Sequence, residues 1–110
     1  MAIVEMTERT GRVTGFEYYE TIADTATGDS IKISPMPAGT YITCTVIPGA
    51  GTGKFQTTTS SAADIVAGSA TWTDWAEGNV TATTSDVITG PVTGIRGVSI
   101  SGEINIEVVI

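Results

Sequence analysis

The stretch that decides the fold is VTGIRGVSISGEINIEVVI, which runs from Val92 to Ile110. Its second half alternates polar residues with a regular apolar set, namely Ile104, Ile106, Val108 and Ile110. Successive side chains of a β-strand point to opposite faces, so a period of two predicts a strand with one buried and one wet face. We therefore predict that Ile104, Ile106 and Val108 lie in the core.

A turn signal divides this stretch in two. Ser101-Gly102 separates two strand-like runs, and glycine supplies the positive φ that a tight hairpin needs. We predict a β-hairpin here. In the first run Ile95 breaks the parity of the other apolar residues, so we also predict a β-bulge near Gly94 and Gly97 that restores one apolar face. Val92, Val98 and Ile100 share one parity, and the bulge would bring Ile95 onto the same face.

The composition agrees with an all-β protein. The chain has 110 residues, which is one domain, and it contains twenty threonines, thirteen glycines and only seventeen charged residues. Threonine favours the half-exposed face of a sheet, and glycine interrupts strands. We predict a single-domain antiparallel β sandwich or barrel, with further strands over residues 12–22, 31–33, 40–47, 54–59, 70–76 and 80–84 and a short run through 87–88.

Two local predictions complete the fold. Residues 31–33 and 40–47 flank the turn Pro35–Gly39, so we expect them to form a hairpin. One short helical turn is expected near residues 61–67, because a serine can cap its start, Asp64 suits a helix N-terminus and Gly68 can end it.

The first ten residues carry Ile3, Val4 and Met6 without a clear period. They could form an edge strand or an arm that lies on a neighbouring subunit, and we favour the arm. The domain boundaries are then an N-terminal arm over residues 1–10 and a β domain over residues 11–110. The three apolar residues become candidates for an interface.

Catalytic and metal-binding chemistry has little support in the sequence. The chain has no histidine and a single cysteine, Cys44, which we interpret as a small core thiol in a strand. The run Gly49–Lys54 imitates a phosphate-binding loop but lacks the Ser or Thr after the lysine and a helix to follow it. Asp74 with Glu77 or Asp86 could form an acid–base pair, although scattered acids are more often solvated edge residues. We expect no enzymatic activity, no cofactor and no metal.

Trp72 and Trp75 are three positions apart, which in a strand places them on opposite faces. One could fill the core while the other stays exposed as an interface anchor or a platform for a sugar ring. The alternative is that both serve packing within or between subunits, and we favour that alternative. Trp75 is the tryptophan we assign to an interface.

The charge balance limits the class of partner. Net charge is −7, and the five basic residues are scattered, whereas a nucleic-acid-binding protein clusters its Lys and Arg. No apolar run approaches a membrane span, and the acidic N-terminus differs from a signal peptide. We expect a protein made in the cytoplasm that binds neither nucleic acid nor membrane.

Residues 51–110 resemble a recurring type of small bacteriophage virion protein. The resemblance is carried by Thr59-Ser60-Ser61 with Ile65 and Gly68, by Trp72 and Asp74-Trp75 with Gly78 and Val80, by Pro91–Arg96, and by the closing strand from Gly102-Glu103. It implies a non-enzymatic structural role on the virion surface, as a capsid decoration, cement or head-fibre protein. The implied partners are the major capsid protein or other virion proteins, and we expect a homo-oligomer, with a trimer on a local threefold as our choice. The alternative is a receptor- or glycan-binding module of a head fibre or tail, or a minor tail protein.

Overall fold

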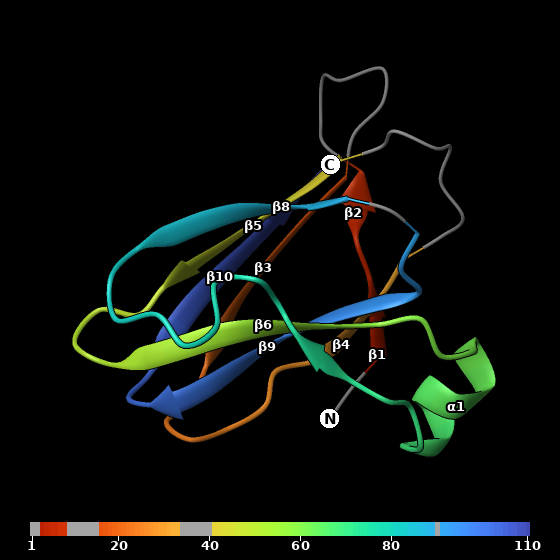
Figure 1. Ribbon diagram of the computed structural model, residues 1–110, viewed down its shortest axis with the longest axis horizontal. Helices are drawn as coiled ribbons and strands as arrows, with labels where there is room; N and C mark the ends of the chain where they lie inside the picture. The colour runs from red at the N-terminus through yellow and green to blue at the C-terminus, as the bar shows by residue number, and fades with distance from the viewer. Residues whose placement is uncertain (1–2, 9–15, 34–40, 90) are drawn as a thin grey trace.

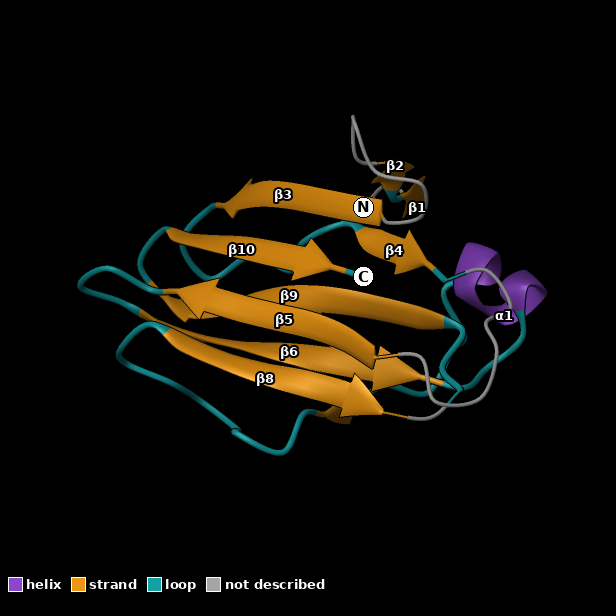
Figure 2. Cartoon of the chain, turned by 90° about the horizontal axis from the view of Figure 1, so that it is seen from above, coloured by secondary structure: helices purple, strands orange, loops and turns teal. Residues whose placement is uncertain are grey.

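Two β-sheets pack face to face and share the apolar faces that the alternation predicts (Figures 1 and 2). The computed structural model describes residues 3–8, 16–33, 41–89 and 91–110. Sheet A has the order β1 (Ile3–Glu5), β4 (Ser30–Lys32), β9 (Gly94–Ser101), β6 (Thr52–Thr58) and β7 (Thr73–Asp74). Sheet B has the order β2 (Thr7–Glu8), β3 (Phe16–Ile22), β10 (Ile104–Val109), β5 (Tyr41–Ile47) and β8 (Thr84–Thr89). The predicted all-β sandwich is confirmed.

The strand pairing has a simple rule. Counting inward from the two ends of the segment β3–β10, β3 pairs with β10, β4 with β9, β5 with β8, and β6 with β7, all antiparallel. The chain is therefore one long antiparallel hairpin wrapped around a core, with the extra pairs β10–β5 and β9–β6 closing the two sheets. This strand order is that of a jelly roll. β1 and β2 add one short strand to an edge of each sheet.

The predicted hairpin at Ser101-Gly102 is wrong in its pairing. β9 lies in sheet A and β10 in sheet B, so the turn carries the chain across the sandwich. Gly102 does adopt the left-handed conformation, with φ of 73°, and its N–H donates to the Asp24 carboxylate at 2.7 Å. Alternation identifies the buried face of a strand but not its hydrogen-bonding neighbour.

The prediction that one apolar face of β9 holds Ile95 together with Ile100 is also wrong. Ile95 is fully buried, whereas Ile100 is 40% exposed, so the two side chains lie on opposite faces of β9. The register shift between β6 and β9 lies opposite Thr52 and Gly53, at the far end of β9 from the predicted bulge near Gly94 and Gly97. The sequence misleads here because Gly97 and Ser99 occupy inward positions without apolar side chains.

The expected hairpin between residues 31–33 and 40–47 is wrong for the same reason. β4 lies in sheet A and β5 in sheet B, and β5 pairs with β10 and β8 instead. Pro35–Gly39, on which that prediction rested, is outside the described residues. The strand predicted over residues 12–22 is confirmed from Phe16 onward, and its first four residues are likewise outside the description.

The short helix is confirmed. α1 spans Ala62–Ala67, the Ser61 side chain accepts a hydrogen bond from the Asp64 N–H at 3.1 Å, and Gly68 ends the helix in the left-handed conformation. The strand predicted over 54–59 begins two residues earlier, as β6. The strands predicted over 70–76 and 80–84 reduce to the two residues of β7 and a single bridge between Val80 and Gly53, with β8 following from Thr84.

The core depends on a close approach of the two sheets. Ile104, Ile106 and Val108 are at most 1% exposed, as predicted. Gly97 of sheet A lies beneath Ile22 and Ile106 of sheet B, and a Cβ at Gly97 would come within 2.7 Å of the Ile22 Cδ1 atom. Glycine at this position therefore lets the isoleucines of sheet B fill the space that a side chain of sheet A would occupy.

Candidate functional site

The three apolar N-terminal residues belong to the domain itself. Residues 3–5 pair with β4 in sheet A and residues 7–8 pair with β3 in sheet B, so residues 3–8 are edge strands, the alternative to the arm. Val4 and Met6 are half-buried against the core. Ile3 is 38% exposed and lies on the opposite face of β1 from Val4. The structure therefore leaves only Ile3 of this group available to a partner.

Trp75 is in the core rather than on the surface. It is 4% exposed, its indole N–H donates to the Gly78 carbonyl at 2.7 Å, and its ring packs in a T-shaped arrangement with Phe55, with 5.1 Å between the ring centroids. A buried and hydrogen-bonded tryptophan is a packing residue, so Trp75 cannot serve as a surface anchor here. The partly exposed tryptophan is Trp72.

The outer face of sheet A is occupied by the chain's own contacts. The Arg96 guanidinium lies 4.2 Å from the centroid of the Trp72 ring, and its Nε–H donates to the Gln56 amide oxygen at 2.8 Å. Gln56 in turn donates to Asp74 at 2.9 Å, and Lys54 forms an ion pair with the same carboxylate at 2.9 Å. These hydrogen bonds, first from Gln56 and then from Lys54, hold the pKa of Asp74 below its ordinary value. We call these five residues the sheet A ladder.

α1 extends this cover. A Cβ at Gly94 would meet Ile65 of α1 at 3.2 Å and Trp72 at 3.3 Å, so both side chains lie over this end of the outer face of sheet A. Figure 2 shows α1 at the same end of the sandwich. Apolar side chains and a connected polar ladder thus cover much of this face.

The outer face of sheet B carries no such cover from the described residues. Strand register aligns its side chains in three rows, which are Thr21–Asn105–Ile47, Tyr19–Glu107–Thr45–Ser85 and Glu17–Val109–Thr43–Val87. The contacts in these rows join immediate neighbours, such as Thr45 to Ser85 at 2.7 Å and Thr21 to Asn105 at 2.6 Å. This is a broad surface of small hydroxyl, apolar and aromatic groups, and within the described residues it is the less covered of the two outer faces.

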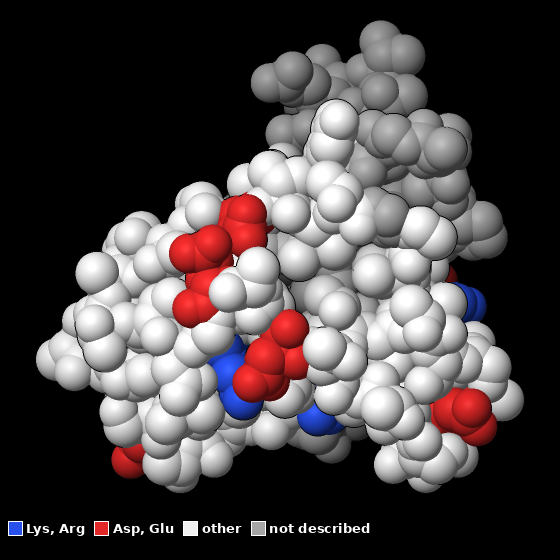
Figure 3. Space-filling model, in the orientation of Figure 1, with Lys and Arg blue, Asp and Glu red and all other residues white. Residues whose placement is uncertain are grey.

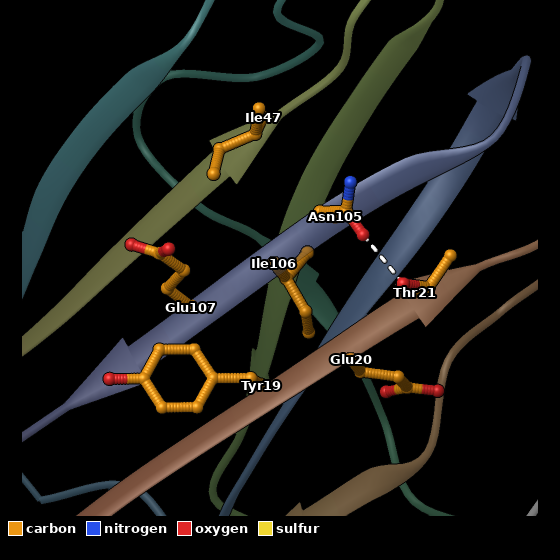
Figure 4. Close-up of a pocket in the computed structure, with 7 residues that line it drawn as sticks. All are labelled: Tyr19, Glu20, Thr21, Ile47, Asn105, Ile106 and Glu107. Atoms are coloured by element: carbon orange, nitrogen blue, oxygen red, sulfur yellow. Dashed lines mark hydrogen bonds between the residues drawn. The ribbon is translucent and has the colours of Figure 1, made fainter.

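A shallow depression of about 390 Å³ lies in this face, over β3, β10 and β5. Tyr19, Thr21, Ile47, Asn105 and Glu107 line it with their side chains, as Figure 4 shows. Tyr19 is 56% exposed and its hydroxyl donates to the Glu17 carboxylate at 3.1 Å. An aromatic ring, an amide and a carboxylate therefore line the same depression.

Charge differs between the two outer faces. The described basic residues, Lys32, Lys54 and Arg96, all belong to strands of sheet A, and β3, β5, β8 and β10 contain no Lys or Arg. The outer face of sheet B carries Glu17 and Glu107. Figure 3 shows acidic side chains in separate groups rather than in one continuous patch. The outer face of sheet B is thus mildly acidic, which favours a neutral or basic partner surface.

Half-buried ionisable groups lie together near β3. The Tyr18 hydroxyl donates to Asp29 at 3.2 Å, and the Asp29 N–H donates to both oxygens of Glu20 at 3.1 Å. Burial, together with the charge of Asp29, raises the pKa of Glu20, and burial with the two carboxylates raises that of Tyr18. Sequence reasoning missed this cluster because its members come from a strand and a loop that it treated separately.

The other candidates for chemistry lie apart. Cys44 is fully buried, as predicted, and burial with the nearby Asp86 carboxylate raises the pKa of its thiol to about 12. Asp74 belongs to the ladder on sheet A, whereas Asp86 lies on β8 of sheet B. Lys54, the last residue of the run that resembles a phosphate-binding loop, lies in β6. Within the described ranges, no group of three His, Cys, Asp or Glu side chains is placed to hold a metal ion.

Among the residues that the structure describes, no helix has the length and apolar character needed to cross a membrane. Comparison of the chain with family models, with curated proteins and with solved structures gives no significant match. The functional argument therefore depends on the surfaces described above.

Proposed function

We propose that this chain is a non-enzymatic structural protein of a bacteriophage virion, which decorates or cements the capsid through protein–protein contacts. The observation that carries the proposal is the outer face of sheet B, which has four adjacent strands, an exposed Thr- and Tyr-rich surface and no basic residue. A surface of small hydroxyl and apolar groups can pack closely against another protein. The jelly roll is also an architecture of viral capsid domains, which supports the proposal by analogy of fold.

A reconstitution experiment tests this role. Virions that carry the protein are stripped of it, challenged with heat or a chelator, and supplied again with purified protein. We expect the wild-type chain to restore particle integrity and Thr43→Arg to fail, because Thr43 lies near the middle of the outer face of sheet B. The matched control is Ile100→Arg, which adds the same charge at an exposed position of sheet A. Equal activity of both variants would show that the outer face of sheet B does not make the capsid contact.

A receptor- or glycan-binding module is the second candidate, and the depression at Tyr19 favours it. An exposed tyrosine presents an apolar ring with a polar tip, and the neighbouring Asn105 and Glu107 offer hydrogen-bonding groups of both kinds. Lectins also use the jelly roll. Unchanged integrity of stripped particles, together with saturable glycan binding that Tyr19→Ala abolishes, would favour this function over cementing.

A further inference from the structure

The four edges of the two sheets differ in length. β1 has three residues, β2 two and β7 two, whereas β8 has six. Short edge strands are a common protection against unwanted strand pairing, and so are lysine and proline in an edge. The sequence of β8, TSDVIT, contains neither. β8 is thus the one long open edge among the described strands, and it forms a margin of the molecule in Figure 1.

The open side of β8 can be assigned. Backbone N–H groups along a strand point alternately to its two sides. The Val87 N–H donates to the side chain of its own neighbour, Asp86, at 2.8 Å, so it does not take part in the ladder with β5. Val87 therefore presents its N–H and C=O to the open side, and by the same alternation Ser85 and Thr89 do so too.

We propose that the open edge of β8 pairs with the β8 edge of a second copy of this chain, antiparallel and about a two-fold axis centred on Val87. Each sheet B would then continue into that of the partner. This inference does not depend on the virion role.

Side-chain chemistry favours this register over the one centred on Asp86. Centring on Val87 places two valines opposite each other, Ser85 opposite the partner's Thr89, and Asp86 opposite the partner's Ile88. Shifting the centre to Asp86 keeps the hydrogen-bonding groups in phase but places two carboxylates directly opposite, and like charges in that position destabilise a pair. The intermediate register, which places Val87 opposite the partner's Asp86, would put the outer faces of the two copies on opposite sides of the joint sheet.

Exposed side chains beside the edge support a second copy as the occupant. Val87 is 43% exposed and Tyr41, which lies next to Thr89 in the same row, is 63% exposed. In the Val87-centred register the row from Tyr41 to Thr89 continues to the partner's Ser85, so the tyrosine lies close to the seam. A strand pair alone buries less than the roughly 1,200 Å² of a stable interface. The second copy must therefore also cover these side chains, and we expect only micromolar affinity.

The Asp86 side chain opposes strand pairing at this edge. Its carboxylate occupies the Val87 N–H, which would be the central donor of the two-fold pair. Pairing must displace this contact, and its loss opposes association of the wild-type chain. Asp86→Ala should therefore strengthen self-association, while a substitution that places charge at the centre should weaken it.

Sedimentation velocity over a range of concentrations measures these effects. We expect a monomer–dimer equilibrium for the wild type, a dissociation constant raised at least about tenfold by Val87→Lys, and one lowered several-fold by Asp86→Ala. The matched control is Tyr19→Lys, at an exposed position of the same face on β3, away from the edge. Circular dichroism and the unfolding midpoint verify that each variant folds.

Crosslinking tests the register. The two copies of Val87 face each other with Cα atoms about 5.5 Å apart, whereas the two copies of Ser85 lie about 13 Å apart along the strands. A short thiol crosslinker should therefore join Val87→Cys chains and leave Ser85→Cys chains single, with the buried Cys44 unreactive in both. A wild type that stays monomeric at all concentrations, a trimer, or a dimer equally weakened by Val87→Lys and Tyr19→Lys would overturn the inference. The threefold oligomer expected from the sequence is thus tested directly against a two-fold one.

Discussion

The outer faces of the two sheets differ in how far the chain's own side chains cover them. On sheet A, Arg96, Gln56 and Asp74 are linked in one row, Trp72 lies on the guanidinium, and α1 covers the end at Gly94. On sheet B, contacts join only neighbouring side chains, and the six-residue edge β8 is open. The difference teaches that solvent-facing positions of one domain can form a connected set of contacts on one side and stay largely uncovered on the other.

This comparison requires that the two sheets depend on one shared core, and the largest expected effect is there. Ile106 of β10 is 1% exposed and lies against Gly97 of sheet A. Ile106→Ala removes buried methyl and methylene groups and leaves a cavity, so we expect the free energy of unfolding to fall by about 2–5 kcal/mol. Chemical denaturation measures it.

Asn105→Ala is the control, because it truncates the adjacent, outward residue of the same strand. We expect its effect to stay within about 0.5–1 kcal/mol, mostly from the lost hydrogen bond with Thr21. Equal losses for the two variants would contradict the assignment of inner and outer faces of sheet B.

A second, smaller effect concerns the distance between the sheets. Gly97→Ala places a Cβ within 2.7 Å of Ile22 Cδ1 and 2.9 Å of Ile106 Cγ2. Overpacking of this kind should lower the free energy of unfolding by about 1–3 kcal/mol. Ile22→Val removes the Cδ1 atom, so the double variant should lose less than the sum of the two single variants. Strict additivity would show that the sheets separate freely and that Gly97 does not set their distance.

The sequence predicted the parts of this fold that depend on neighbouring residues. The alternation of Ile104, Ile106 and Val108 identified a core face, and a capping serine and Gly68 marked the ends of α1, where the cap is Ser61. These signals succeed because burial parity and helix capping are local. The turn at Gly102 was also recognised, since a positive φ is a local requirement.

The pairing of strands could not be predicted in the same way. Thr21 bonds to Asn105, 84 positions away, because β3 and β10 are the two ends of one wrapped hairpin. Nothing in either strand specifies that partner, and adjacency in sequence suggested the wrong one. The sequence did not identify the candidate surfaces for the same reason. An outward-facing threonine gives the same sequence pattern on a covered face and on an uncovered one. Trp75 shows the opposite case. Its large aromatic side chain suggested an interface anchor, whereas in the fold it packs against Phe55 in the core.

The smallest predicted effect tests the two outer faces directly. Arg96→Ala removes the hydrogen bond to Gln56 and the contact with the Trp72 ring, so we expect the free energy of unfolding to fall by about 1–2 kcal/mol. Tyr19→Ala truncates an exposed aromatic side chain on sheet B and should change it by no more than about 0.5 kcal/mol.

Arg96→Lys separates charge from geometry in this test. Lysine keeps the positive charge but lacks the planar guanidinium that stacks on the indole and donates to the amide, so it should recover only part of the lost stability. If Arg96→Ala lowered the free energy of unfolding no more than Tyr19→Ala does, the sheet A ladder would be a set of surface contacts that contribute little to stability. Both outer faces would then be equally free to bind partners, and the preference for sheet B would depend on its lack of basic residues and on the open edge of β8.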